Sequence, residues 1–394
     1  MRDMPTHEAF RASAPHAVEG VVQNYAWGST QSLPELLGRA PDGRPQAELW
    51  LGAHHRAPAR VAHEGELDAL VRAQPEALLG ARVAQRFDGQ LPFLFKVLAA
   101  AKPLSIQAHP DLEQAREGYA REQAAGIPLD APHRNYRDAN HKPELIVALT
   151  PFHALKGFRA PEEILERTEP ARAALEQARA ALRSAGLRGF LDALLSLQGE
   201  QRAAAIRASA GVDPWVGRLA EHYPDDSGAL APLFLNRVEL QPGEGLYLDA
   251  RELHAYLEGT GLELMASSDN VLRGGCTPKH VDREELTRVL RFEPSPVQRL
   301  HAVKREEGLG VWETPAAEFE LSLITPGAQG AWRAPRERSA DLLLCTRGTA
   351  QVEADGVRVE LPRGRAALLP AAARDYTVRG EADVHRASVP RPSA

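Results

Sequence analysis

The sequence contains few cysteines, no excess of positive charge and no long apolar run. Its two cysteines, Cys276 and Cys345, are too few for a disulfide framework and fit a reducing compartment. Lysines and arginines number 47 against 53 aspartates and glutamates, and the net charge of −6 gives no basic footprint for nucleic acid. The longest apolar stretch, residues 93–101, contains Lys96 and is about half the length that crosses a bilayer. We therefore expect a water-soluble protein with neither a membrane nor a nucleic acid as its partner.

The first ten residues also lack the apolar segment of a signal peptide, which favours a cytoplasmic protein. A hydrophobic fraction of 43% and a charged fraction of 25% are typical of a folded chain and exclude a wholly disordered or collagen-like protein. A length of 394 residues exceeds one ordinary domain, so two or three domains are expected. We expect the chain to be a monomer.

The middle of the chain differs in pattern from its two ends. Before it, strand-like runs alternate with glycine and proline, and residues 145–149 are apolar and short, as in a buried strand. After residue 160, apolar residues recur at spacings of three, four and seven, which predicts helices that Gly186 and Gly189 should interrupt. Asp213 followed by Pro214 is typical of a helix start. The sequence therefore predicts a small helical bundle inserted into a mainly β protein.

Strand and turn patterns return after residue 235 and contain a short repeat. Residues 238–240 read Val-Glu-Leu and are followed by a glycine and an apolar strand, and the pattern recurs at residues 359–361. Turn signals every ten residues or so favour antiparallel barrels or sandwiches. We expect two related barrels, in which the position of His254 in the first corresponds to Asp375 in the second.

A first candidate site segment combines polar residues with strand-like alternation. Ser105, Gln107 and His109 alternate with apolar residues, so a strand would place all three on one face. That face either lines the interior of a barrel or is solvated, and the alternation alone does not decide between them.

Two further segments carry similar residues. Lys142 and Glu144 follow His141 and share one face at the entrance to an apolar strand, where a charged pair is usually exposed. His254 and Tyr256 share a face after a later turn, where a lone histidine is more often structural. Together with the first segment they supply two imidazoles, a carboxylate and an amide oxygen, which suit a divalent metal. These ligand types do not separate zinc, iron, manganese and nickel.

A fourth segment places acidic and basic residues close together between positions 263 and 279. Glu263 and Asp269 precede Arg273, which is expected in a loop because two glycines follow it and let a backbone approach a ligand closely. Arg273 and Lys279 suit an anion such as a phosphate. The alternative is an ordinary charged surface turn.

These segments resemble those of the type I mannose-6-phosphate isomerase family, also called phosphomannose isomerase. The resemblance runs from residue 22 to residue 282. It includes the blocks QNYAWGS (23–29), AELWLGAHHRAPA (47–59), FLFKVLAAAKPLSIQAHPD (93–111), YRDANHKPELIVAL (136–149), GEGLYLDARELHAYLEG (243–259) and SSDNVLRGGCTPKHVD (267–282). The match of these blocks, in order and at sensible separations, is highly specific.

The resemblance implies cupin-type (jelly-roll) β-barrels with an inserted α-helical domain. On this chain we expect a catalytic barrel with the metal site at residues 1–155 and 233–295. The helical domain is expected at residues 156–232. A C-terminal barrel without metal ligands is expected at residues 296–394.

The resemblance also implies a zinc-dependent aldose–ketose isomerase that interconverts mannose 6-phosphate and fructose 6-phosphate. One zinc ion per chain is expected, and the ligands carried over to this chain are Gln107, His109, Glu144 and His254. The small-molecule partner is a sugar phosphate. Residues expected to bind it are Ser105, Lys279, Tyr256 and Trp27.

Moving a proton between neighbouring carbons of the sugar would proceed through an enediol. Arg273 is expected to stabilise its developing negative charge, as preorganised cations do. Glu263 or Lys142 is expected to transfer the proton, and His141 or Asp269 to assist ring opening. The sequence does not choose within either pair.

Two other classes of protein also fit these residues. Two histidines, a glutamate and a fourth ligand also suit the non-haem iron of a cupin oxygenase. A non-catalytic sugar-phosphate sensor would keep the same pocket without turnover. Oxygen consumption would identify the first, and the absence of turnover the second.

Overall fold

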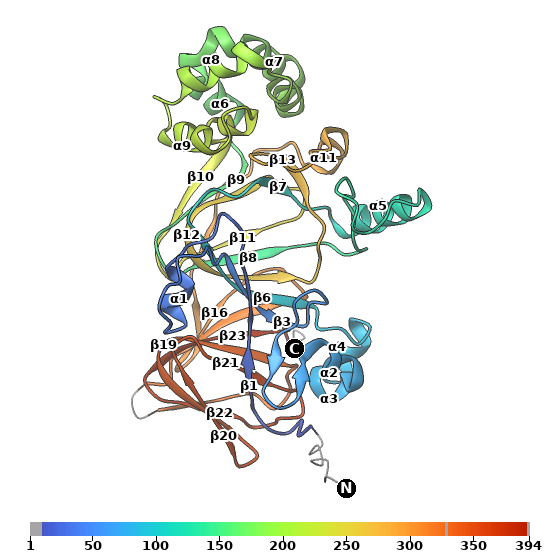
Figure 1. Cartoon of the computed structure of the whole chain (residues 1–394), viewed down its shortest axis with the longest axis vertical. Helices are drawn as coiled ribbons and strands as arrows, with labels where there is room; N and C mark the ends of the chain where they lie inside the picture. The colour runs from blue at the N-terminus through green and yellow to red at the C-terminus, as the bar shows by residue number, and fades with distance from the viewer. Residues whose placement is uncertain (1–9, 328–329, 392–394) are drawn as a thin grey trace. The chain divides into compact units, whose positions relative to one another are not determined.

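The computed structural model describes residues 10–327 and 330–391, which form two compact β-rich units (Figure 1). The first unit consists of residues 10–24, Thr30–Val97 and the described residues from His301 onward. The second consists of Tyr25–Ser29 and Leu98–Leu300. Strand β6 (Phe93–Ala100) passes from the first unit into the second, and all eight of its residues are buried. The mainly β fold with a helical insertion is confirmed.

The first unit is a layered antiparallel β structure with short helices. Its strand order is β15-β16-β17-β23-β19-β21-β1-β4-β5, and β20 and β22 also pair with β19. The strands are β1 (His16–Glu19), β2 (Val21–Gln23), β3 (Glu48–Gly52), β4 (Arg60–Val61), β5 (Gly65–Glu66), β15 (Val303–Glu306), β16 (Leu309–Trp312), β17 (Glu320–Ile324), β18 (Ala331–Arg333), β19 (Asp341–Ala354), β20 (Val357–Pro362), β21 (Ala366–Leu369), β22 (Thr377–Arg379) and β23 (Ala382–Ser388). The helices are α1 (Ser32–Leu36), α2 (Leu67–Ala73), α3 (Pro75–Leu79) and α4 (Ala81–Arg86).

The second unit contains the segments that carry the predicted site. Its strands are β7 (Ile106–Ala108), β8 (Glu144–Ala148), β9 (Phe152–Phe158), β10 (Leu235–Leu240), β11 (Gly245–Leu248), β12 (His254–Ala266), β13 (Leu272–Gly275) and β14 (Arg299–Leu300). The first half of β12 pairs with β7 and β9, and its second half pairs with β8. Gly259 lies at this change of partner with a φ of 126°, and a Cβ there would lie 2.6 Å from the carbonyl oxygen of Pro151. Because one bent strand serves two sheets, the sheets enclose a common interior.

The helical bundle is inserted between two paired strands. β9 and β10 are antiparallel neighbours, and the chain between them forms α6 (Pro161–Arg167), η1 (Glu169–Ala171), α7 (Arg172–Leu195), α8 (Gly199–Ser209), α9 (Pro214–His222), η2 (Ser227–Leu230) and α10 (Ala231–Phe234). Figure 1 shows α6 to α9 gathered beyond one end of β9 and β10. Their apolar faces bury Phe190 and Leu175 in one cluster with Ile106 and Leu155 from β7 and β9. The bundle therefore covers the outer face of the barrel strands.

Two local predictions for the bundle can be compared with its helices. The side chain of Asp213 accepts a hydrogen bond of 3.0 Å from the backbone N–H of Trp215, which confirms the predicted cap of α9. Gly186 interrupts α7 with a φ of 66°, as expected. The predicted break at Gly189 is wrong, because the helix continues through it to Leu195.

The short repeat corresponds to the same local structure in both units. Residues 238–240 lie in β10 and residues 359–361 in β20, and each strand is followed by a turn and a second short strand. Gly243 and Gly364 adopt φ values of 88° and 82°, which non-glycine residues rarely adopt, so each turn requires the shared glycine. The position equivalent to His254 is Asp375, a partly exposed residue outside the strands whose carboxylate pairs with Arg336 at 2.9 Å.

The predicted domain boundaries near residues 155, 232 and 295 stay a prediction. Within the described ranges, no helix is long and apolar enough to cross a membrane.

A buried histidine in the first unit gives a prediction for the pH dependence of stability. His385 lies in β23, its Nδ1 is 3.2 Å from the hydroxyl of Thr346, and its ring stacks on Trp312. Burial lowers the pKa of His385 from 6.5 to about 4. Between these values the unfolded chain binds the extra proton, so stability is complete above about pH 6.5 and is lost as the pH falls toward 4. We expect this histidine to contribute up to about 3 kcal/mol to that loss.

Urea unfolding at pH 7 and pH 4.5 measures this effect. His385→Leu should show a smaller decrease in unfolding free energy between the two pH values than the parent, whatever its absolute stability. His222→Leu is the matched control, because His222 is exposed. Equal decreases in the parent and in His385→Leu would contradict the assignment.

Candidate metal centre and active site

Three predicted ligands meet in the interior of the second unit. His109 follows β7, Glu144 begins β8 and His254 begins β12, and their ligand atoms all lie within 4.8 Å of one another. The Nε2 of His109 is 3.3 Å from one carboxylate oxygen of Glu144, and the Nε2 of His254 is 3.4 Å from the other. All three side chains are at most 1% exposed. The prediction that these separate segments converge is confirmed by this geometry.

The hydrogen bonds of the two imidazoles determine which nitrogen is left for a metal. The Nδ1 of His109 donates to the carbonyl oxygen of Asn270 at 2.7 Å, and the Nδ1 of His254 donates to the carbonyl oxygen of Glu252 at 3.1 Å. A carbonyl only accepts, so both rings carry their proton on Nδ1 and present the lone pair of Nε2 to Glu144. Both Nε2 atoms and the Oε2 of Glu144 are buried without a hydrogen-bond partner. Lone pairs facing a carboxylate repel unless a cation lies between them, so the donor set fits a divalent metal.

The charge of Lys142 balances this site. Its Nζ lies 2.6 Å from the carboxylate of Glu144, and both side chains are buried, so the alternative of an exposed pair does not hold. Burial acts to raise the pKa of Glu144, but this pKa is held well below its ordinary value, chiefly by the positive charge of Lys142. Burial, together with the charge of Lys142, lowers the pKa of His109 to about 4. Both groups are therefore in the protonation states that bind a metal at neutral pH.

Gln107 and Arg273 lie in one row across the strands beside His254. Gln107 is the register partner of His254 on one side and of Arg273 on the other. Side chains of directly opposed residues share a face and lie roughly 5 Å apart at Cβ. This register places Gln107 beside His254 on the same face, and its role as a fourth ligand stays a prediction.

Arg273 lies in β13, not in the loop that its two glycines indicated. Gly274 and Gly275 belong to the same strand, and the strand pairs with β7. Within residues 10–327 and 330–391 no carboxylate forms an ion pair with Arg273, which is only partly exposed. Burial lowers its pKa, and the nearby charge of Arg137 lowers it further. A half-buried guanidinium of this kind can bind an anionic ligand.

Glu263 and Tyr256 face the same interior as the ligands. Glu263 is 3% exposed and is the register partner of Ile146, which lies two residues after Glu144 on the same face of β8. Tyr256 alternates with Ala255 and lies on the face of His254, with 6.3 Å between the two ring centres.

The other predicted residues lie outside the strands of the second unit. Ser105 directly precedes β7, and Trp27 packs against the cluster that contains Tyr256. His141 and Asp269 are partly exposed and lie in the loops that precede β8 and β13. Lys279 is exposed in the loop after β13. The predicted site residues therefore divide between the strands around the ligand group and the loops of the same unit.

Two residues near the site were not predicted from the sequence. Arg137 adds a second positive charge beside Arg273, and Asn270 holds His109 through its carbonyl oxygen. Both lie in segments that also contain predicted site residues. Arg137 is one of 47 basic residues, and nothing in its local pattern distinguishes it from a solvated side chain.

A β-barrel with two histidines and a glutamate around a buried metal position defines a metal-binding protein of the cupin class. The family model for the catalytic domain of phosphomannose isomerase type I matches residues 16–161. Mannose-6-phosphate isomerase of Salmonella typhimurium is 43% identical over 368 residues, covering 89% of this chain and 93% of that protein. The human mannose-6-phosphate isomerase is 32% identical, covering 88% of this chain and 91% of that protein.

Solved structures agree with these relatives. A crystal structure of mannose 6-phosphate isomerase from Salmonella typhimurium, bound to substrate and zinc, is 39% identical with a TM-score of 0.90, covering 96% of this chain and 100% of that chain. A structure bound with zinc and yttrium is 40% identical with the same TM-score and coverage. The chain belongs to the type I mannose-6-phosphate isomerase family, and it is an enzyme of that family.

The barrel after residue 301 is predicted to hold no metal ion. Among the described residues, no group of three close histidines, cysteines or carboxylates includes a residue after His301, and Asp375 replaces the histidine in the second copy of the repeat. Metal analysis of purified protein should therefore give one tightly bound ion. Two equally tight ions would contradict the assignment of the second barrel as metal-free.

Proposed function

We propose that this chain interconverts mannose 6-phosphate and fructose 6-phosphate through an enediol, with one zinc ion held by His109, Glu144, His254 and Gln107. The observation that carries the proposal is the convergence of three buried ligand atoms that have no hydrogen-bond partner. It is supported by relatives named mannose-6-phosphate isomerase and by the zinc and substrate bound in a solved relative. Bound zinc would supply a positive charge close to the sugar oxygen on which negative charge develops.

We assign the proton transfer to Glu263 and a positioning role to Lys142. The ammonium group of Lys142 lies 2.6 Å from Glu144, so it orients a ligand carboxylate and offsets its charge. Glu263 supplies a buried carboxylate on the same interior face, and a carboxylate can take a proton from one carbon and return it to the next. His141 or Asp269 assists opening of the sugar ring, since both lie in the loops that border this face.

The cations of the site bind the two ends of the substrate. Arg273 lies in the row with Gln107 and has no carboxylate partner among the described residues, so it stabilises the oxyanion of the enediol. Lys279 and the segment around Ser105 hold the phosphate, and Tyr256 and Trp27 line the sugar pocket. Binding energy at the phosphate end keeps the reacting carbons in place.

The test is a coupled assay of mannose 6-phosphate conversion with metal-analysed protein, carried out in heavy water. We expect turnover that a chelator abolishes and zinc restores, with deuterium entering the product at the carbon that exchanges its proton. Unlabelled product at full turnover would refute the enediol, because a hydride shift carries no solvent hydrogen. Oxygen consumption, or zinc binding without turnover, would favour the oxygenase or the sensor. The monomeric state and the cytoplasmic location belong to the same proposal.

A further inference from the structure

Asn270 lies at the centre of a buried hydrogen-bond network between two of the ligand segments. Its residue exposure is 0%, and its backbone carbonyl accepts the bond of 2.7 Å from the Nδ1 of His109. Its side-chain oxygen accepts from the backbone N–H groups of Arg137 at 2.7 Å and Asp138 at 3.2 Å. Its side-chain nitrogen donates to the carbonyl oxygens of Asp138 at 2.9 Å and Asn140 at 2.8 Å. One amide thus satisfies four backbone groups of a single loop.

The same loop leads directly to the metal position. Asn140 is two residues before Lys142, whose ammonium group holds Glu144. Asn270 therefore contacts one ligand, His109, directly through its backbone carbonyl. It is linked to a second ligand, Glu144, indirectly through the loop and Lys142. The carboxylate of Asp138 strengthens this arrangement, because it accepts from the hydroxyl of Ser268 at 2.8 Å and from the backbone N–H of Asp269 at 2.7 Å.

We propose that Asn270 is a positioning residue that couples the orientation of His109 to the loop at residues 137–142, and so sets the metal affinity and the placement of Lys142. The proposal rests on the proposed metal site. The side chain satisfies groups that would otherwise be buried without partners, and leaving such groups unpaired is costly. Substitution of the side chain keeps the carbonyl that bonds His109 but removes the bonds that hold it in place. We therefore expect a weakening of the size that is typical when a metal ligand loses an outer hydrogen-bond partner, about 10–100-fold.

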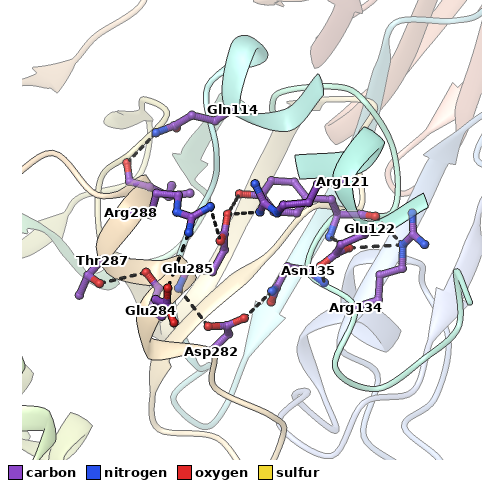
Figure 2. Close-up of polar contacts among 12 residues, drawn as sticks. Gln114, Arg121, Glu122, Arg134, Asn135, Asp282, Glu284, Glu285, Thr287 and Arg288 are labelled. Atoms are coloured by element: carbon purple, nitrogen blue, oxygen red, sulfur yellow. Dashed lines mark hydrogen bonds and ion pairs between the residues drawn. The ribbon is translucent and has the colours of Figure 1, made fainter. Parts of the chain in front are cut away.

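A separate network at the base of the same loop supplies the matched control. Figure 2 shows α5 (Leu112–Ala124) and α11 (Arg283–Val289) joined there, with Arg121 at 2.6 Å from Glu285 and Arg134 at 3.5 Å from Glu122. Tyr136, the neighbour of Arg137, donates its hydroxyl to Glu285 at 2.6 Å. Tyr136→Phe removes this one bond and leaves every bond of Asn270 in place.

The experiment measures zinc affinity of the metal-free full chain by competition with a chromogenic chelator. Asn270→Ala should bind zinc about 10–100-fold more weakly than the parent, and its kcat should fall more than its KM rises. Tyr136→Phe should bind zinc within about twofold of the parent. Parental affinity in Asn270→Ala, or equal weakening in Tyr136→Phe, would overturn the proposal, the latter because any loosening of the loop would then suffice.

A second variant covers the case in which the alanine variant does not fold. Asn270→Asp keeps an oxygen for the two N–H groups but replaces the donor, so that a carboxylate faces the carbonyl oxygens of Asp138 and Asn140. It should weaken zinc binding to a similar degree, and unchanged affinity would overturn the role of the donor. Because zinc binding is read without turnover, a chain that binds zinc as described but does not isomerise the sugar would refute only the proposed function.

Discussion

Glu144→Gln is expected to lose its zinc and nearly all turnover. The carboxylate of Glu144 lies between two imidazole nitrogens at 3.3 and 3.4 Å and an ammonium group at 2.6 Å, with 1% of the residue exposed. Glutamine keeps the size of the side chain but removes the charge that Lys142 and the metal both require. Breaking a buried charge pair costs roughly 3–5 kcal/mol, which corresponds to a roughly 10²–10⁴-fold weaker affinity for zinc.

Metal analysis after dialysis, together with the coupled assay, measures this loss. Glu239→Gln is the control, because Glu239 is an exposed residue of barrel strand β10. The control should retain one zinc ion and parental activity. A Glu144→Gln variant that keeps stoichiometric zinc and turns over at the parental rate would show that the metal lies elsewhere.

Arg273→Ala is expected to lower kcat by roughly 10²–10³-fold, or about 3–4 kcal/mol, by analogy with the loss of one oxyanion donor. Its guanidinium is partly buried and has no carboxylate partner in the described part of the chain, so its charge is available to the substrate. The charge that it stabilises appears mainly in the transition state, so KM should change less than kcat.

Lys279→Ala is the companion variant and should mainly raise KM. The phosphate carries its charge in both the ground state and the transition state, so the loss of a phosphate contact weakens both equally. Steady-state kinetics of the two variants separate the roles. If Arg273→Ala instead mainly raises KM and Lys279→Ala mainly lowers kcat, then Arg273 binds the phosphate and the assignment is reversed. Arg137, whose positive charge lowers the pKa of Arg273, would then be a second candidate for binding the phosphate.

Several features of the fold follow from local sequence, and they were predictable for that reason. Strand alternation placed Gln107 on the face opposite Ile106 and Ala108, and in the structure these two apolar residues are buried in the cluster beneath the helices. The cap at Asp213 and the break at Gly186 depend on the backbone within a few residues. The same applies to the glycines of the repeated turn.

The kinds of metal ligand were also present in the sequence, but their convergence was not. His109, Glu144 and His254 are up to 145 residues apart, and only the pairing of β12 with both β7 and β8 brings them within 4.8 Å. Ligand chemistry follows from residue type, whereas distance follows from register between strands that the chain reaches by long connections.

The tertiary structure alone decided the environment of the charged residues. Local pattern indicated an exposed pair for Lys142 and Glu144, yet the barrel buries both, because the charge of each and the hydrogen bonds around them offset the cost of removing them from water. Arg273 was expected in a loop, but its segment forms a strand that pairs with β7. No local sequence pattern distinguished Asn270 as a site residue. Its role arises from five contacts with segments 130 or more residues away, and such contacts exist only once the chain has folded.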